Sequence, residues 1–303
     1  MRQQTPQPLL PIGSCDCHSH LYLPLDEFPV LPGQHFEANA GLGEYLDVCG
    51  TLGVSRHVIV QGKAYPGPDA TLAAVSRLGA DRSRAIIFPT GTMTMTDEQL
   101  VVWHEAGVRG FRFLSRAGED VDGDRIAAAA DRIAHLGWHV IVQAEADALA
   151  RHYDRLASLP TPVVVDHLGR LPRDPAAERH ALTALLGFLA KGGWIKISSP
   201  YNLTLDGASD FSSLADVVRS LVSAAPQKCI WGLNFPHPNL SAGQKPDETW
   251  TLRSLLKLLD SAEVARLFVT NPQQLYGFPA VSEGRMTPVS DQPASRQLTG
   301  RGL

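Results

Sequence analysis

The sequence predicts an α/β fold, a (β/α)8 TIM barrel that forms a single domain. Eight short apolar runs alternate with eight segments of helical periodicity over roughly 250 residues, which is the pattern and the size of this barrel. A doubly wound parallel sheet is the alternative that the same alternation allows. It is less favoured because no G-x-G-x-x-G motif follows the first apolar run.

The expected strands are short apolar runs that end in polar or glycine-containing segments. They are 14–17, 57–61, 85–89, 108–113, 138–143, 163–166, 194–198 and 229–233. Several of the expected helices begin with an acidic residue and several end at a glycine, as helix ends favour. The expected helices are 42–52, 70–78, 97–106, 123–136, 146–156, 176–190, 211–224 and 247–259. A closing pair of short helices is expected over 262–278, with Asn271 and Pro272 as its cap.

The barrel domain is expected over residues 14–278, with a disordered tail on each side. Residues 1–13 are rich in Gln and Pro, and residues 279–303 are rich in Ser, Pro, Gln and Arg. Segments of this composition bury too little apolar surface to fold.

The composition is that of a globular enzyme. Of the 303 residues, 44% are hydrophobic and 19% are charged, and the formal net charge is −4. This mild charge, without a run of Lys or Arg, argues against a nucleic-acid partner. No apolar stretch reaches the ~18–20 residues that span a bilayer, so no membrane role is expected. The N-terminus lacks a hydrophobic signal core, which favours a cytoplasmic location, with the cysteines as buried free thiols.

Histidines follow the first and sixth expected strands, at the end of the barrel where active sites lie. His18 and His20 form an H-x-H pair, so both rings lie on one face at metal-ligand spacing. His167 follows the apolar run at 163–165, and Arg170 is one short loop away. The sequence therefore predicts three imidazoles at one mouth of the barrel.

Cations and amides follow the other expected strands. Arg112 lies inside an apolar strand, where its guanidinium must bind an anion to offset desolvation, and a bound carboxylate is favoured over a structural ion pair. The other candidates, in chain order, are Lys63, Arg116, Gln143, Asn202, Asn234 and His237. This set suits a carbonyl substrate that carries negative charge.

Six motifs occur in order between residues 14 and 278. They are D-C-H-x-H at 16–20, G-x-R-G-F-R-F at 107–113, G-W-H-V at 137–140, V-D-H-x-G-R at 165–170, W-G-x-N-x-P-H-P at 231–238 and T-N-P-x-x-L-Y-G-F at 270–278. With these motifs the chain resembles the amidohydrolase superfamily, specifically the branch that contains 2-pyrone-4,6-dicarboxylate lactonase and galactarolactone isomerase.

The resemblance implies a distorted TIM barrel and, for the lactonase, hydrolysis of a lactone without a bound metal. By position, His18 and His20 match the first-strand histidines of the branch. His167 matches the histidine that helps to polarise the lactone carbonyl. The substrate-binding arginines of the branch are matched by Arg112, by Arg170 and, approximately, by Arg116.

Several positions depart from the pattern of the branch. Its water-activating aspartate is Asn234 here, and an amide cannot act as a general base. Asn202 stands in place of an arginine, Gln143 in place of a tyrosine, and Lys63 in place of a serine. The binding site is therefore rebuilt, and 2-pyrone-4,6-dicarboxylate is not the expected substrate.

Asn234 also bears on the cofactor, because an amide binds a hard or borderline cation less well than a carboxylate does. No metal is expected. A divalent metal such as zinc, if bound, would be held by His18, His20 and His167. A small anionic molecule is the expected partner, and the protein is expected to be a monomer or a homodimer.

Three functions remain open. The favoured one is a metal-independent hydrolase that opens the lactone of a small carboxylated substrate, with an imidazole as the base and Asn234 holding substrate or water. The second is a lactone isomerase, in which a substrate hydroxyl replaces water as the nucleophile. The third is a substrate-binding protein whose catalysis is impaired by Asn234. Decarboxylation ranks last, because related decarboxylases keep the metal-binding aspartate.

Overall fold

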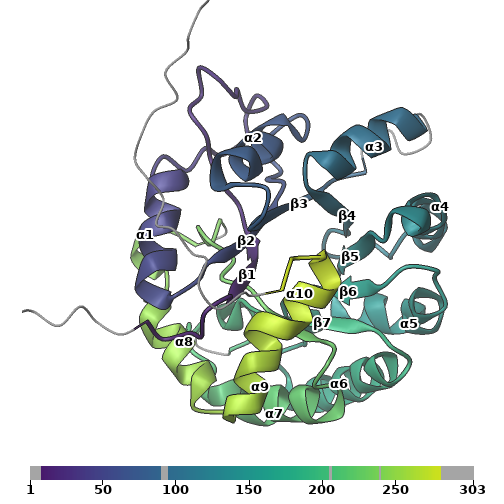
Figure 1. Cartoon of the computed structure of the whole chain (residues 1–303). Helices are drawn as coiled ribbons and strands as arrows, with labels where there is room; N and C mark the ends of the chain where they lie inside the picture. The colour runs from purple at the N-terminus through teal and green to yellow at the C-terminus, as the bar shows by residue number, and fades with distance from the viewer. Residues whose placement is uncertain (1–7, 90–94, 205–206, 239, 281–303) are drawn as a thin grey trace, which may run out of the picture.

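The computed structural model describes residues 8–89, 95–204, 207–238 and 240–280. Eight parallel strands form one sheet in chain order, and the sheet curves into a nearly closed barrel with helices outside it (Figure 1). The (β/α)8 barrel predicted from the alternating pattern is confirmed. The strands are β1 Cys15–Ser19, β2 Arg56–Val60, β3 Ser83–Ile87, β4 Val108–Leu114, β5 His139–Gln143, β6 Val163–Val165, β7 Trp194–Ile197 and β8 Cys229–Trp231.

A helix follows each strand and covers the outer face of the barrel (Figure 1). The eight helices are α1 Leu42–Leu52, α2 Asp69–Leu78, α3 Asp97–Glu105, α4 Gly123–Ile133, α5 Ala146–Ala157, α6 Pro175–Ala190, α7 Ala215–Ala224 and α8 Glu248–Leu256. Acidic caps begin several of them: Asp174 and Asp247 each accept a hydrogen bond from a backbone N–H of the first turn.

The barrel has a seam between β8 and β1. The ladder runs without a break from β1 to β8, but among the described residues no ladder joins β8 back to β1. A single parallel bridge between Ser19 and Phe235 closes the seam instead: Asn234 N–H donates to His18 O at 2.7 Å, and His20 N–H donates to Phe235 O at 2.7 Å. The segment after β8 is thus attached to the end of β1, which brings Asn234 beside the H-x-H pair.

The C-terminal segment closes the opposite end of the barrel. Tyr276 and Phe278 pack with the apolar side chains that fill the interior, and α10 (Asn271–Tyr276) lies across this end in Figure 1. Arg56 and Arg84, from the beginnings of β2 and β3, stack on the Phe278 ring at 5.3 and 4.5 Å from its centroid. Among the described residues this N-terminal end is therefore sealed, and the other end is where a barrel of this kind holds its site.

The closing segment forms one continuous helical run rather than the expected pair. Helix α9 (Ser261–Ala265) passes through a π turn, Arg266–Thr270, directly into α10. Asn271 has helical φ and ψ of −65° and −48°. Its side chain donates to Pro226 O and Cys229 O, so it ties the run to β8 and does not end a helix. Pro272 is tolerated because it lies in the first turn of α10.

The expected tails lie mostly outside the described residues, which begin at 8 and end at 280. Leu10, within the expected N-terminal tail, is nevertheless buried and donates its N–H to Leu52 O at 3.1 Å. Packing on the barrel therefore begins before residue 14. In the described part of the chain, no helix has the length and apolarity that a membrane crossing needs. The four cysteines are buried and unpaired, as expected.

Candidate active site

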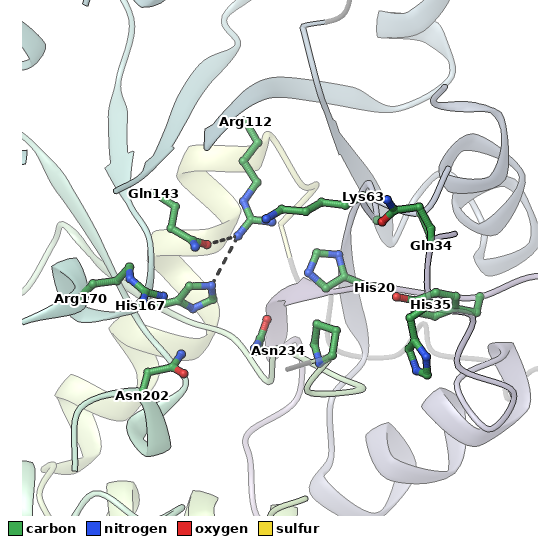
Figure 2. A pocket seen from close by; sticks show the side chains of 14 residues that line it. His20, Gln34, His35, Lys63, Arg112, Gln143, His167, Arg170, Asn202 and Asn234 are labelled. Carbon is green, nitrogen blue, oxygen red and sulfur yellow. Dashed lines mark hydrogen bonds between the residues drawn. The ribbon is translucent and has the colours of Figure 1, made fainter. Parts of the chain in front are cut away.

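A cavity of about 210 Å³ opens at the C-terminal ends of the strands (Figure 2). Eight of the expected site residues line it: His20, Lys63, Arg112, Gln143, His167, Arg170, Asn202 and Asn234. The sequence analysis missed Tyr22, Gln34 and His35, which reach the cavity from the long loop after β1. Nothing in the strand pattern marks a loop side chain of this kind.

Asp16 fixes the backbone beneath the cavity. Its buried carboxylate accepts hydrogen bonds from His18 N–H at 3.0 Å and from the Tyr45 hydroxyl at 2.8 Å. It also accepts from Leu233 N–H at 2.8 Å and from Ser19 Oγ at 2.5 Å. One carboxylate thus binds both sides of the seam, and these donors offset the desolvation of an acid inside a buried strand.

His18 and His20 face each other through their Nε2 atoms, which are 3.2 Å apart. His20 Nδ1 lies 2.8 Å from Val60 O, and because a carbonyl only accepts, this nitrogen carries the proton and Nε2 is an acceptor. The proton between the rings therefore belongs to His18, whose Nδ1 accepts from Lys196 Nζ at 3.2 Å. Burial lowers the pKa of His20 to about 3 and that of His18 well below its usual value, so both rings are neutral at pH 7.

A buried charge cluster, Lys196–Asp166–Arg112, lies under the cavity. Lys196 Nζ is 2.8 Å from Asp166 Oδ1, and Arg112 Nε is 2.9 Å from Asp166 Oδ2. Burial alone would raise the pKa of Asp166, but Lys196 and Arg112 outweigh it and hold this pKa well below its usual value. Two cations share one anion, so the cluster carries one net positive charge, and Arg112 presents that charge to the cavity.

His167 follows Asp166 and begins a short left-handed turn, His167–Arg170, in which all four residues have positive φ. Its Nδ1 lies 2.8 Å from Ser198 Oγ and 3.2 Å from Ser199 Oγ, and its Nε2 lies 3.5 Å from Arg112 Nη2. Burial lowers the pKa of His167 to about 3, so the ring is neutral. Because a guanidinium only donates, His167 Nε2 accepts from Arg112, and Nδ1 carries the proton that the serine hydroxyls accept.

The cavity cations differ in whether an acid already pairs with them. Arg170 Nε lies 3.0 Å from Glu145 Oε1, and Arg112 belongs to the buried cluster. Lys63 makes no ion pair with any acid in the described ranges, and in Figure 2 its side chain points toward Arg112. Burial lowers the pKa of Lys63, and the neighbouring arginines lower it further. The part of the cavity beside Lys63 therefore has excess positive charge, which an anionic group of a ligand would neutralise.

Three expected residues do not line the cavity. His18 lies just below it, in ring contact with both other site histidines at centroid distances of 5.0 and 4.8 Å. Arg116 is exposed, and its backbone N–H donates to Glu119. His237 lies behind Asn234, away from the cavity. The substrate contacts expected for Arg116 and His237 are therefore absent from the cavity wall.

Asp166 and Lys196 were not among the expected site residues, although the sequence contains the signal. Lys196 lies between Ile195 and Ile197 in an apolar strand, as Arg112 does between two phenylalanines. A buried cation requires a buried anion, and Asp166 ends the neighbouring strand. The rule that a cation inside an apolar strand needs an anion therefore points to Lys196 and Asp166 as well as to Arg112.

The buried donor groups beneath the cavity fit a divalent metal poorly. His18, Asp166 and His167 place ligand atoms within 4.8 Å of one another, a different set from the one expected. Both oxygens of Asp166 already face cations, and the proton on His18 Nε2 blocks the nitrogen that an H-x-H site would use. These residues suit a buried ion-pair cluster better than a bound dication.

Known proteins resemble this chain over nearly its whole barrel domain. A family model described as Amidohydrolase matches residues 15–278. A 2-pyrone-4,6-dicarboxylate hydrolase from Comamonas testosteroni is 31% identical over 284 residues, with 89% of this chain and 92% of the relative covered. A D-galactarolactone isomerase from Agrobacterium fabrum is 28% identical over 278 residues, with 89% and 93% covered.

The fold is shared with solved structures. A crystal structure of an Agrobacterium tumefaciens protein in its apo form has a TM-score of 0.78 and 28% sequence identity, and it covers 91% of this chain and 100% of that one.

Proposed function

The chain belongs to the amidohydrolase family, and we propose that it is a lactonase that hydrolyses the cyclic ester of a small carboxylated molecule. The observation that carries this proposal is the Lys196–Asp166–Arg112 cluster, whose net positive charge reaches the cavity at Arg112. Ester hydrolysis passes through a tetrahedral oxyanion, which preorganised positive charge stabilises strongly in a site with little water.

In the proposed reaction the lactone carbonyl oxygen faces the guanidinium of Arg112. Water held by the Asn234 side-chain oxygen adds to the carbonyl carbon, and His20 Nε2 accepts its proton in place of the hydrogen bond from His18. The ring C–O bond then breaks, and the proton passes to the ring oxygen to give the open hydroxy acid. A ring with a pKa of about 3 is a weak base, so oxyanion stabilisation supplies most of the acceleration.

We propose that this reaction needs no metal. The partner cations on both Asp166 oxygens and the proton on His18 Nε2 support this proposal, because a dication would have to displace them. Asn234, in the position of the family aspartate, adds no charged ligand.

Lys63 supports a substrate with one carboxylate. It is the cavity cation without an acidic partner in the described part of the chain, whereas Glu145 already pairs with Arg170. Gln143 and Asn202 are neutral and supply hydrogen bonds without charge. One carboxylate at Lys63 and one developing oxyanion at Arg112 match the two unbalanced positive charges.

A lactone isomerase is the second candidate. No Asp or Glu occurs among the described residues that line the cavity, so no carboxylate is available there to activate water. A hydroxyl of the substrate itself is held close to the carbonyl and needs less activation. One relative is a D-galactarolactone isomerase, which is consistent with this alternative.

The test is an NMR assay of 1,4- and 1,5-lactones that bear no, one or two carboxylates, with EDTA or with added zinc. Hydrolysis releases the open acid, and isomerisation interconverts the two ring sizes without net acid. We expect ring opening of the mono-carboxylated lactones, unchanged by EDTA. Loss of activity in EDTA that zinc restores would contradict the metal-free proposal, and binding without turnover would indicate the impaired binding protein.

Substitution of Lys63 tests the substrate charge. In Lys63→Met, the KM for a mono-carboxylated lactone is expected to rise about tenfold or more, the equivalent of ~1.4 kcal/mol, with a smaller change in kcat. Lys63→Arg keeps the charge and should retain most of the affinity. An equal effect of Lys63→Met on an uncharged lactone would show that Lys63 does not bind the carboxylate.

A further inference from the structure

Behind Asn234, on the side away from the cavity, three polar side chains form a continuous hydrogen-bonded chain. Asn234 Nδ2 donates to the Tyr201 hydroxyl at 2.7 Å, and that hydroxyl lies 3.0 Å from His237 Nδ1. His237 Nε2 lies 2.5 Å from Glu248 Oε1. These residues come from the loops after β7 and β8 and from the first residue of α8, so three segments converge on one side-chain amide.

Burial isolates this chain from solvent. Tyr201 is 5% exposed and His237 4%, and the Glu248 side chain is 15% exposed. Burial raises the pKa of Tyr201 to about 12, so its hydroxyl keeps its proton at neutral pH. Polar groups at this depth must be paired, which makes the direction of each hydrogen bond assignable.

The direction follows from the Glu248 end. A glutamate carboxylate only accepts, so His237 Nε2 carries a proton and donates to it, and in the tautomer with that single proton Nδ1 is an acceptor. The Tyr201 hydroxyl then donates to Nδ1 at 3.0 Å, a nearer partner than Ser199 Oγ at 3.4 Å. The Tyr201 oxygen is left to accept, and Asn234 Nδ2 supplies the proton.

From this geometry we infer that Tyr201, His237 and Glu248 are positioning residues that fix the amide of Asn234 with its oxygen toward the cavity. Figure 2 shows the Asn234 oxygen directed into the space between His20 and His167. The backbone is fixed as well, because Asn234 N–H donates to His18 O. The orientation rests on the structure alone, and its catalytic consequence rests on the proposed function.

The consequence is chemical. An amide oxygen that faces the cavity can only accept a hydrogen bond. Asn234 therefore binds water or a substrate hydroxyl and does not donate to the carbonyl oxygen of the lactone. It holds the nucleophile where a carboxylate would both hold and deprotonate it. The ligand class this favours is a lactone with a free hydroxyl, or a lactone with water beside it.

The direct test is side-chain NMR of the 15N-labelled full chain, with the Asn234 signal assigned by its absence in Asn234→Asp. We expect an Asn234 NH2 group with one proton shifted and protected from exchange, and loss of that protection in Tyr201→Phe. Tyr276→Phe, which removes a buried tyrosine hydroxyl at the sealed end of the barrel, should leave it unchanged. A rapidly exchanging Asn234 amide in the unsubstituted protein would overturn the inference.

Steady-state kinetics of two matched Glu248 variants supply the second readout, because Glu248 ends the hydrogen-bonded series that starts at Asn234. Glu248→Met removes the acceptor for His237 and should lower kcat about 10- to 100-fold with little change in KM. Glu248→Gln keeps an acceptor oxygen and should stay within about threefold of the unsubstituted protein. Equal kcat in both variants would contradict the positioning role. An unsubstituted protein that opens or isomerises no lactone, yet protects the Asn234 amide, would refute the proposed function and leave the orientation intact.

Discussion

The two ends of the barrel use buried arginines in opposite ways. At the N-terminal end, Arg84 donates to backbone carbonyls, including those of Tyr276 and Gly277, and stacks on Phe278. At the C-terminal end, Arg112 donates to the side chains of Asp166 and Gln143 and faces a cavity. Each nitrogen of the Arg84 guanidinium donates to a backbone carbonyl at the first end, whereas the cluster at the second end leaves a net charge for a ligand.

Unusual backbone conformations also distinguish the cavity end of the barrel from the sealed end. In the described part of the chain, the non-glycine residues with positive φ all follow β6, β7 or β8. They are His167, Leu168, Arg170, Ser199, Asn234 and His237. Each such conformation costs on the order of 1–3 kcal/mol, so the strain of the fold is concentrated where side chains must be aimed at a site.

Removal of Lys196, the cation at the centre of the buried cluster, should have the largest effect on activity. In Lys196→Met, the cluster loses its net charge and His18 loses the donor to Nδ1. We expect kcat/KM on the best lactone of the panel to fall about 10²- to 10³-fold. Lys228→Met, a cation substitution just before β8 at the sealed end, should leave kcat/KM unchanged. Activity of Lys196→Met within about threefold of the unsubstituted protein would assign the cluster to stability alone.

The matching substitution at the sealed end should affect stability instead. Arg84→Met removes hydrogen bonds from a charged donor to buried carbonyls, and we expect the free energy of unfolding to fall by about 2–4 kcal/mol. The kcat of the folded protein should not change. Urea unfolding and steady-state kinetics on the same preparation check both parts, and Arg77→Met, a more exposed arginine, is the control. A loss of kcat would mean that the two ends are coupled.

The smallest expected effect is on the pH dependence of stability. His139 packs on the Tyr276 ring at the sealed end, its ring nitrogens have no partner in the described structure, and burial lowers its pKa from 6.5 to about 3. Between these values the unfolded chain binds the proton and the folded chain does not, so stability is lost as the pH falls.

His139→Leu should remove this one contribution, about 1.4 kcal/mol per pH unit between pH 6 and 4. Urea midpoints across that range measure it, and kcat at pH 7 should remain unchanged because the mouth is untouched. His20 and His167, with the same lowered pKa, should retain their share of the slope. Identical slopes for His139→Leu and the unsubstituted protein would show that His139 is not the source.

The fold was predictable because its pattern is local. Each buried strand is an apolar run and each helix an amphipathic segment, and the bounds of α1 were predicted without error. The closing run was missed because Asn271 makes its hydrogen bonds to the loop and strand of β8, more than forty residues away in the chain. A distant partner of this kind is invisible to a propensity argument.

The site was predictable up to the last residue of each strand. Alternation along a strand gives the side on which a residue lies, so Arg112 was correctly placed. His20 and His167 lie one and two residues past the ends of β1 and β6, close enough to the strand ends to line the same cavity. Beyond Trp231 that rule ends, since Asn234 and His237 adopt φ of 64° and 60°. The turn between them directs His237 away from the cavity toward Glu248, and no strand pattern carries that information.

The seam has a thermodynamic meaning of its own. Asn234 belongs to one side of it and His20 to the other, and loop contacts and the Asp16 carboxylate, without a strand ladder, hold the two sides together. A ligand that contacts both Asn234 and His20 therefore bridges the segment after β8 and the end of β1. Occupancy and barrel closure are then linked equilibria, so a bound ligand stabilises the closed seam and an intact seam favours binding of the ligand.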